Sequence, residues 1–101
     1  MHARLRAPGI KPLVACLCSK AVLAVEQASA ALAKLAKVGT DEVRLMIARA
    51  GAIQPLVQLL DGREANGSEL AQQDAAAALA ELSLVPTNKI AIDRAGGSGL
   101  A

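Results

Sequence analysis

Apolar side chains recur along this chain every three or four residues, which is the spacing of one face of an α-helix. The clearest stretch is 20–38, where Leu32 and Leu35 stand among closely spaced alanines. Residues 69–84 carry the same pattern. Shorter stretches with this spacing complete the set of six predicted helices: 12–18, 41–50, 55–60 and 88–95. We therefore predict an all-α protein.

The residues at the ends of these stretches predict where each helix begins and ends. Short polar side chains that suit an N-cap precede four helices: Ser19, Thr40, Ser68 and Thr87. Three glycines are expected to end helices: Gly39, Gly51 and Gly96. Pro12 and Pro55 suit a first helical turn, where no backbone N–H is needed, and Gly9 is expected in a turn. Residues 1–8, the loop at 61–68 and the tail at 97–101 are expected to be loose.

Three segments of the chain recur in the same order. Pro12-Leu13-Val14 returns as Pro55-Leu56-Val57, and Ala31-Leu32-Ala33-Lys34-Leu35-Ala36 returns as Ala78-Leu79-Ala80-Glu81-Leu82-Ser83. Arg49-Ala50-Gly51 returns as Arg94-Ala95-Gly96. The spacing between copies lies in the mid-forties, and three helices in such a period are typical of armadillo and HEAT repeats.

The amino-acid sequence of the repeat resembles that of the armadillo family. Ala50-Gly51-Ala52-Ile53 followed by Pro55-Leu56-Val57-Gln58-Leu59-Leu60 is similar to the joint between its first and second helices. The stretch 75–84 resembles its third helix, and 88–96 resembles the next first helix. The resemblance implies a right-handed superhelical α-α solenoid of about two repeats. We divide the chain accordingly: 1–8 flexible, 9–39 a partial repeat, 40–85 a complete repeat, 86–96 the first helix of a third, and 97–101 a flexible tail.

The resemblance also implies a function. In the family, the third helices line a concave groove that grips extended peptides, so we expect a non-catalytic module that binds a protein or peptide partner. The groove positions that correspond here are Gln27, Ala30, Lys34, Lys37, Asp74, Ala77 and Glu81. The best-known groove carries a tryptophan and an asparagine where this chain has Ala30 and Lys34, so recognition of nuclear-localisation peptides is not implied. The alternative interpretation is a solvated face on which Lys34 and Glu81 are neighbours, contributing about 0.2–1 kcal/mol.

Two other functions fit the same fold. The wording Leu82-Ser83-Leu84 followed by Asn88-Lys89 is similar to the armadillo arrays that follow a U-box, which implies the substrate-recruiting part of a ubiquitin ligase. The second alternative is a structural module whose exposed repeat ends self-associate. This alternative follows from where the repeats are cut: the chain begins at the second helix of one repeat and stops after the first helix of another. Such an arrangement is expected of a fragment, a truncated product or a self-associating unit.

Composition narrows the classes of partner. The formal net charge is +2 and no residue is aromatic, so the basic surface and stacking side chains that nucleic-acid binding needs are absent. No apolar run reaches the roughly 20 residues of a membrane-spanning helix. The basic stretch before residue 25 is compatible with organelle targeting, but the repeat explains its apolar residues as core. We expect an intracellular protein, cytoplasmic or nuclear.

Candidate catalytic chemistry is sparse. His2 is the single histidine and lies near the terminus, so no nucleophile in the helical region has an imidazole base. Cys16 and Cys18 lie about 200° apart around a helix and could not grip one metal ion together. By alignment with Leu59, Cys16 is expected in the core. We therefore predict no enzyme, no cofactor and no metal.

Overall fold

The chain forms six α-helices in the computed structural model, which describes the backbone of residues 2–62 and 67–96 and the side chains of these ranges from residue 9 onward. The helices are α1 (His2–Leu17), α2 (Val22–Val38), α3 (Asp41–Arg49), α4 (Ile53–Leu60), α5 (Glu69–Leu82) and α6 (Pro86–Arg94). No strand occurs in these ranges. The all-α prediction is confirmed.

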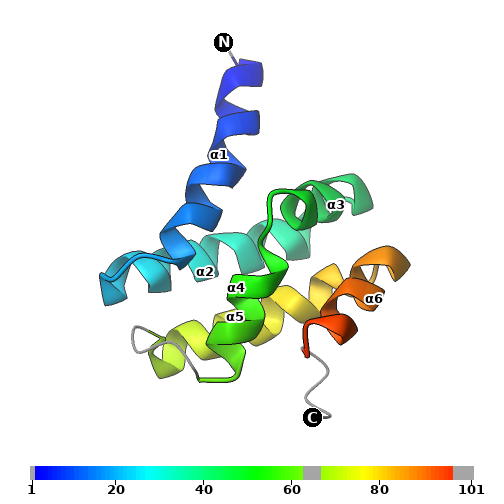
Figure 1. Ribbon diagram of the computed structural model, residues 1–101. Helices are drawn as coiled ribbons and strands as arrows, with labels where there is room; N and C mark the ends of the chain where they lie inside the picture. Colours follow the sequence, from blue (N-terminus) through cyan, green and yellow to red (C-terminus); the bar gives the residue numbers. More distant parts are fainter. Residues whose placement is uncertain (1, 63–66, 97–101) are drawn as a thin grey trace.

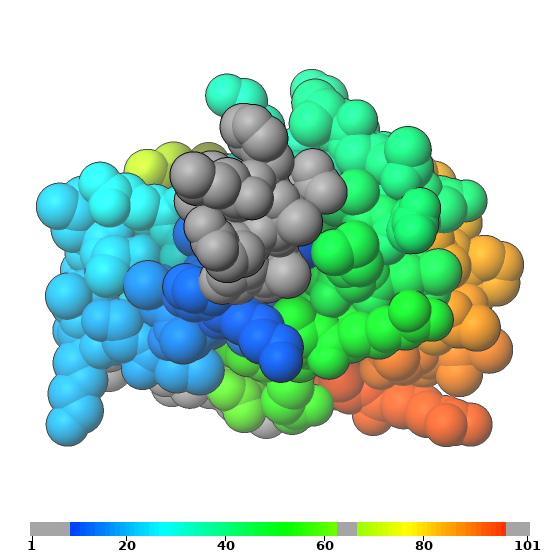
Figure 2. All heavy atoms as spheres, turned by 90° about the horizontal axis from the view of Figure 1, so that it is seen from above, coloured from blue at the N-terminus to red at the C-terminus, as the bar shows by residue number. Residues whose placement is uncertain are grey.

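The helices stack as two successive units. The two long helices α2 and α5 lie side by side, with α1 packed on α2 and α4 packed on α5 (Figure 1). The short helix α3 contacts both α2 and α5, and α6 contacts both α4 and α5. Seen from above, the start of α2 and the end of α6 lie at opposite sides of the molecule, with α3 and α4 between them (Figure 2). Each unit therefore buries its apolar face against the next one, as repeat proteins do.

The core is aliphatic, and small side chains line the contact between the two long helices. The bulkiest fully buried side chains are Leu32, Ile47, Leu56, Leu59 and Leu82. Between them, α2 and α5 bury a series of small residues: Ala28, Ser29, Ala36, Ala71, Ala75 and Ala78. Because alanine and serine project little beyond the backbone, the two helices can approach closely along their length. The same two helices also bury Leu32, Leu79 and Leu82.

Polar side chains tie the two units together. The Arg44 Nε donates to the carbonyl oxygen of Ala36 at the end of α2 (2.9 Å), and its Nη1 pairs with Asp41 (2.9 Å). The Ser68 hydroxyl accepts from the Ala71 N–H and donates to Glu26 of α2. All buried side-chain nitrogen and oxygen atoms in the described ranges have a partner. Close packing between the units therefore leaves no buried side-chain nitrogen or oxygen in these ranges without a hydrogen-bond partner.

Helix α1 differs from its prediction. We expected a turn at Gly9 and a helix beginning at Pro12, but one continuous helix runs from His2 through both residues. Ile10, Leu13, Val14 and Leu17 follow helical spacing and adjoin or belong to the core. That apolar stripe begins before Pro12, so packing holds the helical backbone there, while exposed Pro12 forgoes one backbone hydrogen bond.

Two helix starts were also placed wrongly. Ser19 is not the N-cap of α2, because its hydroxyl accepts from the Ala21 N–H (3.0 Å) and the helix begins only at Val22. Thr87 is not the N-cap of α6, which begins at Pro86. Proline is well suited to the first helical position because its fixed φ matches the helix and no N–H is required.

Most of the other predicted helix caps are confirmed, and one adopts a different backbone conformation. Thr40 and Ser68 cap α3 and α5, and Gly51 and Gly96 both adopt φ +90°. Gly39 ends α2 with an extended backbone rather than a left-handed one. Glycine is required there by space, since a Cβ would lie 2.6 Å from the Leu35 carbonyl oxygen.

Cys16 is exposed, so its predicted place in the core is wrong. Its counterpart Leu59 is buried because α4 lies between other helices, whereas α1 has no described helix on its outer side. Residues 1–8 were predicted to be loose, but residues 2–8 belong to helix α1, so that prediction is wrong. Within the loop predicted at 61–68, residues 61–62 and 67–68 are non-helical, while Met1, 63–66 and the tail at 97–101 lie outside the described residues.

No single helix in the described ranges is long and apolar enough to span a membrane. Together α3 and α4 meet the length and composition criteria, but their axes are bent by 85°.

Leu32→Ala should destabilise the protein strongly, because Leu32 is fully buried between the units. We expect a loss of about 2–5 kcal/mol in the free energy of unfolding, measured by urea denaturation. Leu84→Ala is the matched control: Leu84 is 61% exposed, so the change should stay within about 0.5 kcal/mol. Equal effects of the two substitutions would contradict this assignment of the core.

Gly51→Ala and Gly9→Ala should act in opposite directions. A Cβ at either position meets nothing within 4 Å, so only backbone conformation differs. Alanine at φ +90° should cost about 1–2 kcal/mol. Alanine inside α1 should stabilise the protein by about 0.5–1 kcal/mol. Thermal denaturation of both variants measures this, and destabilisation by Gly9→Ala would argue against a helix through residue 9.

Candidate functional site

A groove runs between the two long helices and contains most of the predicted partner-binding residues. Its volume is about 560 Å³. It is lined by Ala30, Ala33, Lys34, Lys37 and Val38 of α2 and by Asp74, Ala77, Ala80 and Glu81 of α5. Six of the seven predicted residues are in this set. Gln27 is exposed on α2 but does not line the groove.

Helical spacing explains why these side chains share one surface. On α2, Ala30, Lys34 and Lys37 are separated by four and three residues, and on α5 Asp74, Ala77 and Glu81 follow the mirror pattern. Residues three and four apart lie on one face of a helix. Because α2 and α5 lie side by side, their two faces form a single groove. Alanines make its floor, and charged side chains stand along its edges.

The two edges of the groove carry opposite charge. Lys34 and Lys37 stand on α2, and Asp74 and Glu81 stand on α5. Glu81 pairs with Arg44 at 3.9 Å (Nη2 to Oε1), rather than with Lys34 as the solvated-face interpretation expected. Lys34, Lys37 and Asp74 make no hydrogen bond or ion pair with any other described residue. Three charged groups of the groove are therefore available to a ligand.

Three apolar residues that line the groove are not among the seven predicted partner-binding residues. Ala33 and Ala80 extend its floor, and Val38 adds an apolar side chain that is 72% exposed. Val38 lies four residues after Lys34, so helical spacing could have identified it. An exposed valine beside two lysines gives this end of the groove a mixed apolar and basic character.

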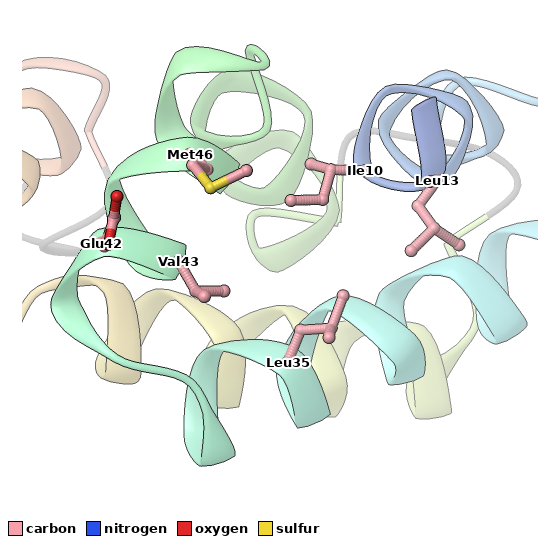
Figure 3. Close-up of a pocket in the computed structure, with 7 residues that line it drawn as sticks. Ile10, Leu13, Leu35, Glu42, Val43 and Met46 are labelled. Carbon is pink, nitrogen blue, oxygen red and sulfur yellow. The ribbon is translucent and has the colours of Figure 1, made fainter. Parts of the chain in front are cut away.

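A second cavity lies at the other side of α2 and was not indicated by the sequence. It has a volume of about 550 Å³ and lies between α1, α2 and α3. The side chains that surround it are almost all apolar: Ile10, Leu13, Leu35, Val43 and Met46, with Glu42 at the edge (Figure 3). A cavity with one carboxylate and no base offers contact area rather than catalytic groups.

The described side chains give no constellation for metal binding. No three histidine, cysteine, aspartate or glutamate side chains among them lie together as metal ligands would. Cys16 and Cys18 are both free thiols on the surface. The chemistry that the described surface offers is therefore contact through apolar floors and unpaired charges.

Comparison with protein families agrees with the geometry. The armadillo/beta-catenin-like repeat family matches residues 40–84, which contain α3, α4 and α5. No curated protein and no solved structure matches the chain. Armadillo repeats typically bind protein partners and are generally non-catalytic scaffolds. The narrower resemblance to arrays that follow a U-box stays a prediction. Residues 40–84 thus belong to the armadillo repeat family, and the chain is an all-α solenoid of the armadillo type.

Proposed function

We propose that this chain is a non-catalytic interaction module that binds an extended peptide segment of a partner protein in the groove between α2 and α5. The observation that carries the proposal is the groove itself, where six residues selected from the sequence line one surface of about 560 Å³. Its floor of alanines leaves room for a peptide main chain. The family relationship supports a protein as the class of ligand.

The charges of the groove define the kind of segment that would fit. Lys34 and Lys37 on α2 would form ion pairs with carboxylates of the ligand, and Asp74 on α5 would form an ion pair with a basic side chain. Glu81 is less available because Arg44 lies beside it. A segment with acidic residues along one side and a basic residue on the other complements this arrangement. Because the groove has no aromatic or arginine anchor on its floor, its affinity should depend on these charges more than on a hot spot.

Ligands for this test come from a phage-displayed library of random peptides selected against the purified chain. Selected peptides are synthesised with a fluorophore, and their dissociation constants are measured by fluorescence anisotropy. We expect enrichment of peptides that carry both acidic and basic residues. Peptides whose affinity does not change when the groove is altered would contradict the proposal.

Ala77→Leu should weaken binding of the selected peptides by filling the floor of the groove. We expect at least a tenfold loss, which corresponds to about 1.4 kcal/mol. Ala91→Leu on α6 is the matched control, because Ala91 is also an exposed helical alanine but lines no part of the groove. Lys34→Ala should weaken the acidic peptides and leave the circular dichroism spectrum unchanged. Equal loss with both leucine variants would point to a general effect on folding.

A further inference from the structure

Corresponding residues of the two units differ in burial. In the second unit Ile53, Leu56 and Leu82 are all buried, at 9%, 0% and 0% exposure. Their counterparts in the first unit, aligned by the internal repeat, are Ile10, Leu13 and Leu35. All three are only partly buried, and they line the cavity between α1, α2 and α3. The first unit therefore leaves open a surface that the second unit covers.

Helix α3 lies against part of this surface in the second unit, on α5. It packs against α5 as well as α2, and its Ile47 is fully buried. Its Arg44 reaches Glu81, the residue directly before Leu82. No described helix takes the corresponding place on the first unit, where Ile10, Leu13 and Leu35 point into a cavity instead (Figure 3). The chain thus contains both a filled and an unfilled version of one helix-binding site.

We propose that the cleft between α1, α2 and α3 binds an acidic amphipathic helix of a partner protein, seated on the first unit as α3 is seated on the second. The apolar lining would receive an aliphatic side chain in the place of Ile47. This site is separate from the peptide groove, and the proposal does not depend on the proposed function.

The charges around the cleft specify an acidic partner. Lys34 stands in the first unit where Glu81 stands in the second, so the partner should carry a carboxylate where α3 carries Arg44. An adjoining cavity of about 360 Å³ shares Ile10 and Met46 with the cleft and adds two exposed cations, Lys11 and Arg49. Glu42 is the one carboxylate among the residues that line the two cavities. The described residues that line the two cavities thus include two cations and one carboxylate, and Lys34, which lines the peptide groove, adds a third cation at the position that corresponds to Glu81. This balance favours a negatively charged helix.

The same comparison disfavours a second copy of this chain as the occupant. Helix α6 resembles α3 in sequence and would be the segment to dock, but it carries Lys89 where α3 carries Arg44. Lys89 would then approach Lys34 of the other copy, and like charges repel at such a contact. Lys34, which stands where Glu81 holds Arg44 in the second unit, would thus work against self-association.

The experiment uses two synthetic peptides as probes. One has the sequence of residues 40–52, and the other has the same sequence with Arg44→Glu. Each is titrated into ¹⁵N-labelled full chain, and dissociation constants are fitted from amide chemical shifts. We expect the Arg44→Glu peptide to bind at least tenfold more tightly, with shifts at Ile10, Leu35 and Val43. In the Lys34→Glu chain, the order of the two peptides should reverse.

Matched variants identify the site. Met46→Asp places a negative charge in the apolar cleft at a residue that is 37% exposed, and it should abolish binding of the acidic peptide. Ile90→Arg, on an exposed apolar residue of α6, and Ala77→Leu in the peptide groove should leave binding unchanged. Equal affinity of the two peptides for the unmodified chain would overturn the proposal. A dimer in sedimentation that Met46→Asp dissociates would overturn it in favour of a second copy.

Discussion

The contact between α2 and α5 is the interaction on which the rest of this structure depends. It is built from small buried residues such as Ala28, Ser29, Ala75 and Ala78, which allow the two helices to lie close together. Burial of these residues removes apolar surface from water without demanding the detailed fit of large side chains. The remaining helices then attach to this pair, α1 and α3 on α2, and α4 and α6 on α5. A bulky residue in the contact would separate the two units.

The close approach also creates the candidate binding groove. The residues of α2 and α5 that face away from the core are brought to the two sides of one channel, with alanines between them. The polar ties at the ends of the contact shape its charge, because Arg44 engages both Ala36 and Glu81. Lys34 and Asp74 are left without a pairing partner among the described residues. The core residues and the groove residues therefore lie on different faces of the same two helices.

The two units are not equivalent, although their sequences repeat. In the second unit α3 packs against α5, and in the first unit the residues that correspond on α1 and α2 line a cavity. Leu13 and Leu35 are therefore partly exposed in the cleft, whereas their counterparts Leu56 and Leu82 are fully buried in the second unit.

The sequence by itself determined the helices, the repeat and most of the groove. Helical spacing, the caps at Thr40 and Ser68 and the glycine at 51 are local properties, so the residues that carry them could be read without a structure. Lys34 and Glu81 could be placed on one face for the same reason. Tertiary structure alone decided the continuous course of α1 through Pro12, the exposure of Cys16 and the open cleft beside α3. These depend on which helices lie next to one another, and packing across the units can outweigh the conformational preference of any single residue.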